Sequence, residues 1–339
     1  MLNKILKEYK RFIKKEFRKI VDSSSWHKKN ELLEEIFEFD IIAECKEYKV
    51  VWKKYLDENA ALLNIKLDNL KKDLDKESYN LIDLVYRRIT TIFPCIDEVS
   101  LFYTRKADIL TESEIQYKNY KIDGILPAHG MIVPEESVFH YHSGLKCLSA
   151  NILDRIKNTD FIDGGAFIGD SAFTFVKYNP KRIFAFEPSD ENFANMKKNI
   201  SLEKFDELII PVKKGVFSKT GNVSVSGENL CFFIDDENLN NAENKETIEV
   251  VSLDDFVEEN NLNVGLIKLD VEGVESDVIN GALNTIKKFK PVLLISIYHN
   301  PKDFFEIKPL IESLDLGYNF MIKKLNNRRL IAETMLIAY

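Results

Sequence analysis

Residues 161–171 read FIDGGAFIGDS, and this stretch decides the fold class. Two apolar residues lead into Asp163, and Gly164 and Gly165 then permit a tight turn. The residues that follow have a helical pattern, with Ser171 as the expected N-terminal cap. A strand that turns directly into a helix is typical of a βαβ unit, in which neighbouring strands run parallel.

Short apolar runs continue to alternate with helical stretches after this turn. The expected parallel strands include RIFAFE at 182–187, GLIKLD at 265–270 and PVLLISIY at 291–298. Two strands close the sequence, YNFMIKKL and ETMLIAY, with only the short stretch NNRRLIA between them. A parallel crossover needs about a dozen residues or more, so we expect this terminal pair to be antiparallel. The pattern predicts an α/β fold with a mostly parallel sheet.

The first part of the chain has a different pattern, because its apolar residues recur at three- and four-residue steps as in amphipathic helices. Pro94 is expected to end this helical part. We therefore predict three regions: an all-helical N-terminal region over 1–94, a mixed connecting and substrate-side segment over 95–158, and a ligand-binding domain over 159–339.

The composition is that of an ordinary soluble protein, with 45% hydrophobic and 30% charged residues in a chain of 339. No apolar run reaches the roughly 20 residues of a membrane span, and the first residues lack the pattern of a secretory signal. The four cysteines have no paired spacing for zinc or redox chemistry. We expect a cytoplasmic protein with reduced thiols.

Charge is distributed unevenly along the chain. Residues 1–20 carry eight Lys or Arg and two Glu, a local charge of +6. Because the whole chain has a net charge of −8, the remaining residues sum to −14. An acidic body argues against nucleic acid as a partner, because phosphate contacts need clustered cations. The basic N-terminal helix is expected to pack within the chain or in a homodimer, and contact with an anionic membrane surface is the less favoured alternative.

The order of the glycines indicates the kind of ligand. A dinucleotide site favours G-x-G-x-x-G, whereas this turn has G-G-x-x-x-G after an acid. Asp163 would repel a pyrophosphate, but it suits a sulfonium or an amino group. Glu187 ends the next strand, where a carboxylate can accept both hydroxyls of a ribose. A nucleoside with a cationic tail fits both acids, and S-adenosylmethionine is such a molecule.

Four segments resemble the FkbM-type methyltransferases: DGGAFIGDS, FAFEPS, VVSLDDF and IKLDVEGVESDVINGA. The resemblance covers about residues 136–339. It implies the class I methyltransferase fold, with a Rossmann-like sheet, and methyl transfer from S-adenosylmethionine to hydroxyl oxygens, often on sugars, glycans or natural products. By position it also implies cofactor contacts at Asp163, Gly165 and Glu187. Gly164 and Phe167 of the same turn complete the predicted cofactor site.

Further acids and a histidine follow the later strands, where the carboxyl ends of parallel strands share one edge of the sheet. Asp270 ends one strand and His299 follows another. A hydroxyl acceptor must lose a proton, and a histidine with a pKa near neutrality is a predicted general base, with Asp270 as the second catalytic residue. Glu272 and Tyr298 are expected on the substrate side. Glu275 is either a site acid or a favourable charge at a helix N-terminus.

The same residues allow a metal site as an alternative. Asp270, Glu272 and His299 together could hold Mg²⁺ or Mn²⁺, and their spacing leaves the choice between base and metal open. His140 and His142, two apart on an expected strand, would face one way. We expect this pair to line the substrate side, since a metal there lacks neighbouring acids.

Two other functions compete with a methyltransferase. One is a non-catalytic module with the same fold whose helical region binds a partner, and the other is a nicotinamide-dependent dehydrogenase, which the glycine order disfavours. The four basic residues near the terminal strands are expected to be solvated rather than to bind an anionic acceptor: Lys323, Lys324, Arg328 and Arg329.

Overall fold

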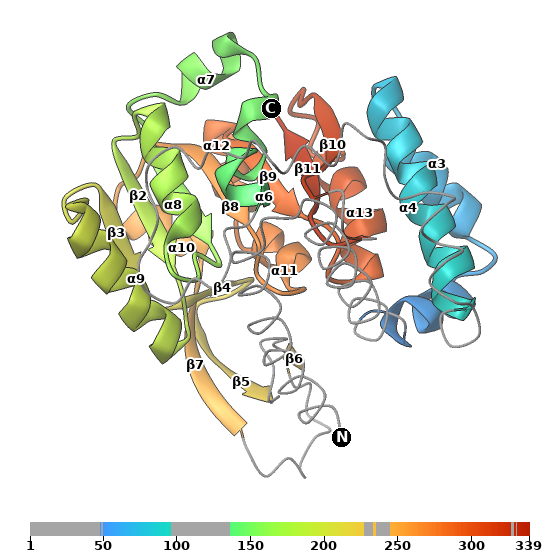
Figure 1. Ribbon diagram of the computed structural model, residues 1–339, viewed down its shortest axis with the longest axis horizontal. Helices are drawn as coiled ribbons and strands as arrows, with labels where there is room; N and C mark the ends of the chain where they lie inside the picture. Colours follow the sequence, from blue (N-terminus) through green and yellow to red (C-terminus); the bar gives the residue numbers. More distant parts are fainter. Residues whose placement is uncertain are drawn as a thin grey trace, which may run out of the picture.

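A computed structural model of the chain describes residues 48, 50–95, 136–226, 233–234, 245–326, 329 and 331–339. Its centre is a seven-stranded sheet with helices on both faces (Figure 1). The strand order is β10-β11-β9-β8-β1-β2-β3. The strands are β1 (Asp160–Gly164), β2 (Arg182–Phe186), β3 (Ile209–Val212), β8 (Val264–Leu269), β9 (Val292–Ser296), β10 (Phe320–Lys324) and β11 (Thr334–Ala338).

The sheet confirms the predicted α/β class. Strands β1, β2, β3, β8 and β9 pair in parallel, whereas β11 is antiparallel to both β9 and β10. The chain builds outward from β1 to β2 and β3, then returns to the other side of β1 with β8 and β9. The strand order thus reverses between β1 and β8, and in open α/β sheets ligands bind at the carboxyl ends of strands at such a point.

Two hydrophobic cores lie on the two faces of the sheet, because successive strand residues point to opposite sides. In β1, Phe161 joins one core and Ile162 joins the other. Helices α7 (Ala150–Ile156), α8 (Asp170–Phe175) and α9 (Asp190–Glu203) cover the face of Phe161. The opposite face is covered by α10 (Leu253–Glu259), α11 (Glu275–Asn280), α12 (Leu283–Phe289) and α13 (Pro301–Glu312).

A second, four-stranded sheet projects from the body beside the carboxyl ends of the central strands (Figure 1). This sheet was not predicted from the sequence. Its order is β4-β7-β5-β6, and its longest pair is the antiparallel one between β5 and β7. Two of its strands have only three and two residues, too few for a periodic pattern. The strands are β4 (Gly215–Phe217), β5 (Gly221–Ser226), β6 (Phe233–Ile234) and β7 (Lys245–Ser252).

The described N-terminal part is helical, as predicted, and packs on the β10 edge of the sheet. It comprises a helical stretch over 50–58, α3 (Leu63–Lys71) and α4 (Lys76–Cys95), which continues through Pro94. Trp52 is fully buried, with its ring 5.5 Å from that of Phe304 on α13. Lys66 Nζ lies 2.7 Å from Glu306 Oε1 of the same helix. The helical region therefore shares one hydrophobic core with the sheet.

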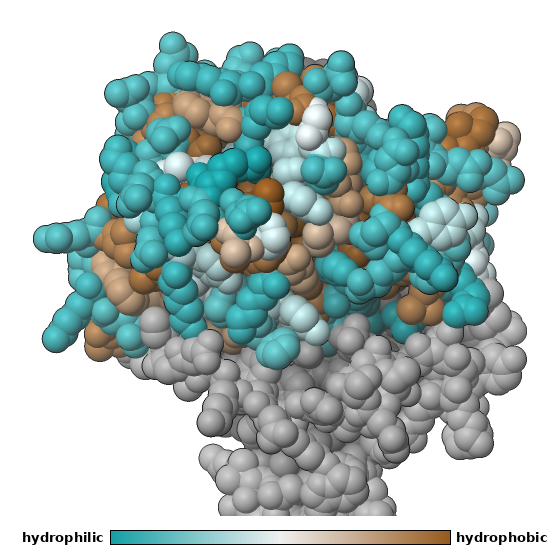
Figure 2. Space-filling model, turned by 90° about the horizontal axis from the view of Figure 1, so that it is seen from above, coloured by the Kyte–Doolittle hydropathy of each residue, from teal (hydrophilic) through white to brown (hydrophobic). Residues whose placement is uncertain are grey.

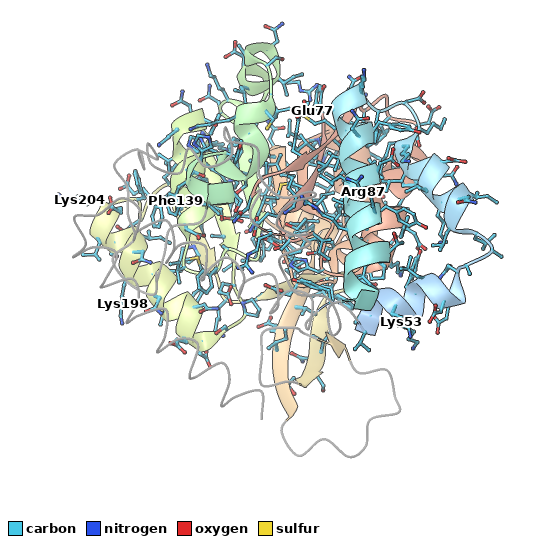
Figure 3. The ribbon with its side chains drawn as sticks, turned by 45° about the vertical axis from the view of Figure 1, so that its right-hand side comes forward. Lys53, Glu77, Arg87, Phe139, Lys198 and Lys204 are labelled. Carbon is cyan, nitrogen blue, oxygen red and sulfur yellow. The ribbon has the colours of Figure 1, made fainter. Side chains whose placement is uncertain are left out.

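Helix α4 also holds one of the basic side chains near the terminal strands. Lys323 Nζ lies 2.7 Å from Glu77 Oε2, and Glu77 is labelled on α4 in Figure 3. Lys324 Nζ donates to the carbonyl oxygen of Asn326 at 2.8 Å. Both lysines thus have protein partners, which corrects the expectation that they are merely solvated. Arg328 and the basic helix predicted near the start of the chain lie outside the described residues.

The structure has no helix, in the part of the chain that it describes, that is long and apolar enough to span a membrane. On the face seen in Figure 2, hydrophobic side chains appear as separate areas between hydrophilic ones.

Two short elements precede α7 and β1: α6 (Glu136–Phe139) and the 3₁₀ helix η2 (His142–Cys147). A further 3₁₀ turn, η3 (Val176–Tyr178), follows α8.

Candidate active site

A cavity of about 260 Å³ opens at the carboxyl ends of β1, β2, β8 and β9, where the strand order reverses. Residues of α6 and η2 line one side of it, and strands β4, β5 and β7 of the second sheet line another. Its polar lining brings together five acidic side chains from separate parts of the sequence: Asp170, Glu187, Asp270, Glu272 and Glu333. Both sequence-predicted halves of the site, after β2 and after β8, therefore meet in one cavity.

Gly165 is required at the end of β1 by the close approach of β8. Its φ is +74°, a left-handed conformation that side chains rarely adopt. A Cβ added here would overlap the carbonyl oxygen of Asp270 and lie 2.8 Å from its carbonyl carbon. Gly164 is also crowded, since its added Cβ would lie 2.9 Å from Leu269 Cδ2. Gly165 lines the cavity, and the packing of two backbones there demands glycine even before a ligand is considered.

Asp163 lies beneath the cavity rather than in its lining. Its side chain is fully buried, accepts a hydrogen bond from Ser171 Oγ at 2.5 Å and lies 3.2 Å from Lys268 Nζ. The sequence predicted Ser171 as the N-terminal cap of α8, and this is wrong. Gly169 occupies the cap position with φ +89°. In this structure the contacts of Asp163 are with Ser171 and Lys268, and its predicted contact with a ligand stays a prediction.

Lys268 is a buried cation that the sequence analysis missed. It lies in the apolar strand β8, is only 5% exposed and lines the cavity. Its Nζ donates to the carbonyl oxygen of Gly165 at 2.8 Å. Burial works against its charge, but the carboxylates of Asp163, Asp270 and Asp170 outweigh burial and raise the pKa of Lys268. The available signal was a lysine in the middle of the otherwise apolar run GLIKL at 265–269.

Two predicted cofactor residues, Glu187 and Phe167, line the cavity on the β2 side. Glu187 is 6% exposed, and its Oε1 accepts the backbone N–H of Ser189 at 2.8 Å. Burial raises the pKa of Glu187, although the N–H groups around it act in the opposite direction. Phe167 has φ +49° and is 40% exposed. A bulky residue held at positive φ with an open aromatic face fits a binding role.

Asp170, at the start of α8, is a further acid in the cavity that was not predicted. It is 8% exposed, and its Oδ1 accepts the backbone N–H of Ser171 at 2.8 Å. Burial raises the pKa of Asp170 to about 6, while nearby Lys268 limits the rise. Its charge therefore changes just below neutral pH.

Glu275 anchors the turn that follows β8. Its carboxylate is fully buried and accepts backbone N–H groups from Val271 at 2.9 Å and Gly273 at 3.0 Å. The same carboxylate lies 2.8 Å from His299 Nδ1. The sequence left two roles open for Glu275, a site acid or a favourable charge at a helix N-terminus, and the structure shows a different one. Glu275 shapes the turn and orients a histidine.

His299 follows β9 and points into a cluster of carboxylates. Its Nε2 lies 3.4 Å from Asp270 Oδ1 and 3.4 Å from Glu272 Oε2. Burial lowers the pKa of His299, but Glu275 and then the two other carboxylates outweigh it and raise the pKa to about 10. This corrects the expected value near neutrality. With no other ligand the ring holds its proton at pH 7, so His299 is not poised as a general base.

Tyr298 and Glu333 complete this side of the cavity. The Tyr298 hydroxyl donates to Asp270 Oδ1 at 3.4 Å, a long hydrogen bond. Burial and the charge of Asp270 raise the pKa of Glu333. Glu333 was not predicted, because it precedes β11, whose amino end meets the carboxyl end of β9. Only the antiparallel pairing brings it to this rim.

The histidine pair before β1 is not arranged as the sequence predicted. His140 and His142 lie in a turn and in η2, not on a strand, and neither lines the cavity. His142 Nδ1 lies 2.7 Å from the Tyr178 hydroxyl in the protein interior. The expected segment does cover the cavity, but through other side chains, those of Ser137, Val138 and Ser143.

Comparison with known proteins agrees with this architecture. Residues 163–320 match the methyltransferase FkbM domain. This part of the chain is similar to an FkbM-type methyltransferase domain. It holds all the cavity residues from β1 to β9, whereas the helical N-terminal region and Glu333 lie outside the match. The fold class and the family resemblance drawn from the sequence are thereby confirmed.

Two known proteins are similar to this chain, one over less than half of its length and one over most of it. A protein of Haloferax volcanii named hexuronic acid methyltransferase AglP is 26% identical over 155 residues, 45% of this chain and 62% of that protein. The crystal structure of methyltransferase FkbM from Methylobacillus flagellatus KT has a TM-score of 0.56 at 20% identity, covering 86% of this chain and 62% of that one. The chain thus spans a little less than two thirds of the length of either relative.

Proposed function

We propose that this chain is an S-adenosylmethionine-dependent O-methyltransferase that acts on a hydroxyl of a sugar, glycan or natural product. The observation that carries the proposal is the position of Glu187 in the cavity beside the switch point of the sheet. A carboxylate after the second strand can accept the two hydroxyls of a ribose. The FkbM-type domain and the name of the Haloferax relative support methyl transfer to a sugar.

The two ends of the cavity suit the two halves of the reaction. Phe167 offers an aromatic face, Glu187 an acceptor for ribose hydroxyls, and Gly165 a close approach to the backbone, so the methyl donor is assigned to this end. The acceptor is assigned to the other end, beside Asp270 and Tyr298. Lys268 also lines the cavity and is paired with Asp163.

In the reaction the acceptor oxygen forms a bond to the methyl carbon as the carbon–sulfur bond breaks, giving a methyl ether and S-adenosylhomocysteine. The hydroxyl proton leaves in the same event. Asp270, with a side chain 29% exposed at the cavity, is the proposed recipient in place of His299, whose raised pKa keeps it protonated. Alignment of the two reacting atoms supplies most of the acceleration.

Calorimetry with S-adenosylmethionine and, separately, with NAD tests the proposal. We expect saturable binding of the first at one site and none of the second, and methylated product with a hydroxyl-bearing sugar from a panel of acceptors. Absence of S-adenosylmethionine binding by the pure, folded chain would overturn the proposed function.

A further inference from the structure

The carboxylates around His299 surround its exposed-side nitrogen, Nε2, in a group that could hold a cation. Nε2 is equally far, 3.4 Å, from Asp270 Oδ1 and Glu272 Oε2. Charge-assisted hydrogen bonds are about 2.7–2.9 Å long, so both contacts of Nε2 are longer than a direct ion-paired hydrogen bond. Neighbouring ligands of an octahedral Mg²⁺ lie about 2.0–2.1 Å from the ion and about 2.8–3.0 Å apart, so an ion in this cluster would draw the two carboxylates closer to Nε2 than they lie now.

The orientation of the His299 ring is set by a contact on its other nitrogen, Nδ1. Its Nδ1 lies 2.8 Å from Glu275 Oε1, and Glu275 is fixed by the backbone N–H groups of Val271 and Gly273. Histidines that bind metals have their second nitrogen held in this way by a carboxylate or a carbonyl. Glu275 also lies within 4.8 Å of Asp270 and His299, but backbone donors occupy its oxygens, so it acts as the support.

The exposure of the three side chains leaves an open side toward the cavity. His299 is 5% exposed, whereas Asp270 and Glu272 are 29% and 41% exposed and line the cavity. A cation bound by these three groups would have coordination positions facing the proposed acceptor end. Glu333 adds a further negative charge there, while Lys268 is paired with Asp163.

We infer that Asp270, Glu272 and His299 form a binding site for one divalent cation of the Mg²⁺ or Mn²⁺ class. Carboxylates with one neutral imidazole suit such ions, so the ion would take the place of the proton on His299 Nε2, and that proton would be released to solvent on binding. If the chain has the proposed function, this site favours acceptors with two adjacent hydroxyls, because a sugar diol can fill two coordination positions of one ion. A cation here would lower the pKa of a bound hydroxyl, and the carboxylate of Asp270 would accept its proton as the methyl group is transferred.

Manganese binding to the full chain tests the site without any assay of activity. The metal-depleted protein is titrated with MnCl₂, and free Mn²⁺ is followed by its electron paramagnetic resonance signal. We expect one Mn²⁺ per chain in the wild type and at least tenfold weaker binding in Glu272→Gln. Glu333→Gln is the matched control, since it removes a negative charge from the same cavity without removing a ligand, and should weaken binding less than threefold.

Two results would overturn the site: no Mn²⁺ binding by the wild type up to 1 mM, about the weak end of specific sites, or equal losses in the two variants, which would mean that charge alone attracts the ion. His299→Gln, checked for folding by its thermal transition, should lose Mn²⁺ binding as Glu272→Gln does. S-adenosylmethionine affinity, measured in the same samples, separates the proposals. Retained S-adenosylmethionine binding without Mn²⁺ binding refutes the cation site alone.

Discussion

Replacing Gly165 by alanine should destabilise the protein before any ligand is bound. Its φ of +74° alone costs a non-glycine residue about 1–2 kcal/mol. The added Cβ would also overlap the Asp270 carbonyl oxygen, which is backbone and cannot rotate away. Relief requires a shift of the end of β8, comparable to overpacking a core at about 1–3 kcal/mol. The sum is about 2–5 kcal/mol.

Gly317→Ala provides the matched control. Gly317 has φ +69°, nearly the same conformation, but its added Cβ would meet only Lys290 Nζ at 4.0 Å. We expect this variant to show the conformational cost alone, about 1–2 kcal/mol. Urea unfolding of both variants without S-adenosylmethionine measures the difference. If Gly165→Ala is no less stable than Gly317→Ala, the backbone contact does not require glycine, and its role is to leave space for the ligand.

Three further substitutions test the donor site, the pH response and the domain organisation. Glu187→Gln should weaken S-adenosylmethionine binding by about 1–3 kcal/mol in calorimetry, whereas the exposed Glu191→Gln should not; equal affinities would refute the ribose assignment. Asp170 has a folded pKa of about 6 against 3.8 unfolded, so its contribution to stability falls as pH rises through this window. The stability of Asp170→Asn relative to wild type should therefore increase by about 2–3 kcal/mol between pH 4 and 6.5 in urea unfolding, and a flat difference would contradict the raised pKa. Trp52→Ala, which empties the contact with α13, should cost about 3–5 kcal/mol in one cooperative transition; a separate early transition would mean that the helical region unfolds independently.

The parallel core of the fold and the residues at its carboxyl edge could be predicted from the sequence. Buried parallel strands are continuous apolar runs, and the residue after each run must lie at the same edge as the residue after its neighbours. This local logic brought Glu187, Asp270, Glu272 and Tyr298 into one predicted site, and all four line the cavity. The terminal antiparallel pair was predictable for the same reason, since its connection is too short for a crossover.

The interactions among these residues could not be predicted from the sequence and are seen in the folded structure. The near-neutral pKa expected for His299 assumed an ordinary environment, but Glu275, 24 positions earlier, lies 2.8 Å from its ring and keeps it charged. Asp163 similarly looked like a ligand contact, yet its partners are Ser171 and Lys268 in the interior. The strand pattern specifies which edge a side chain approaches, whereas its charge and orientation depend on groups that the fold brings from distant parts of the chain. Electrostatic interactions between such groups have no periodicity in sequence, so they became visible only in the folded molecule.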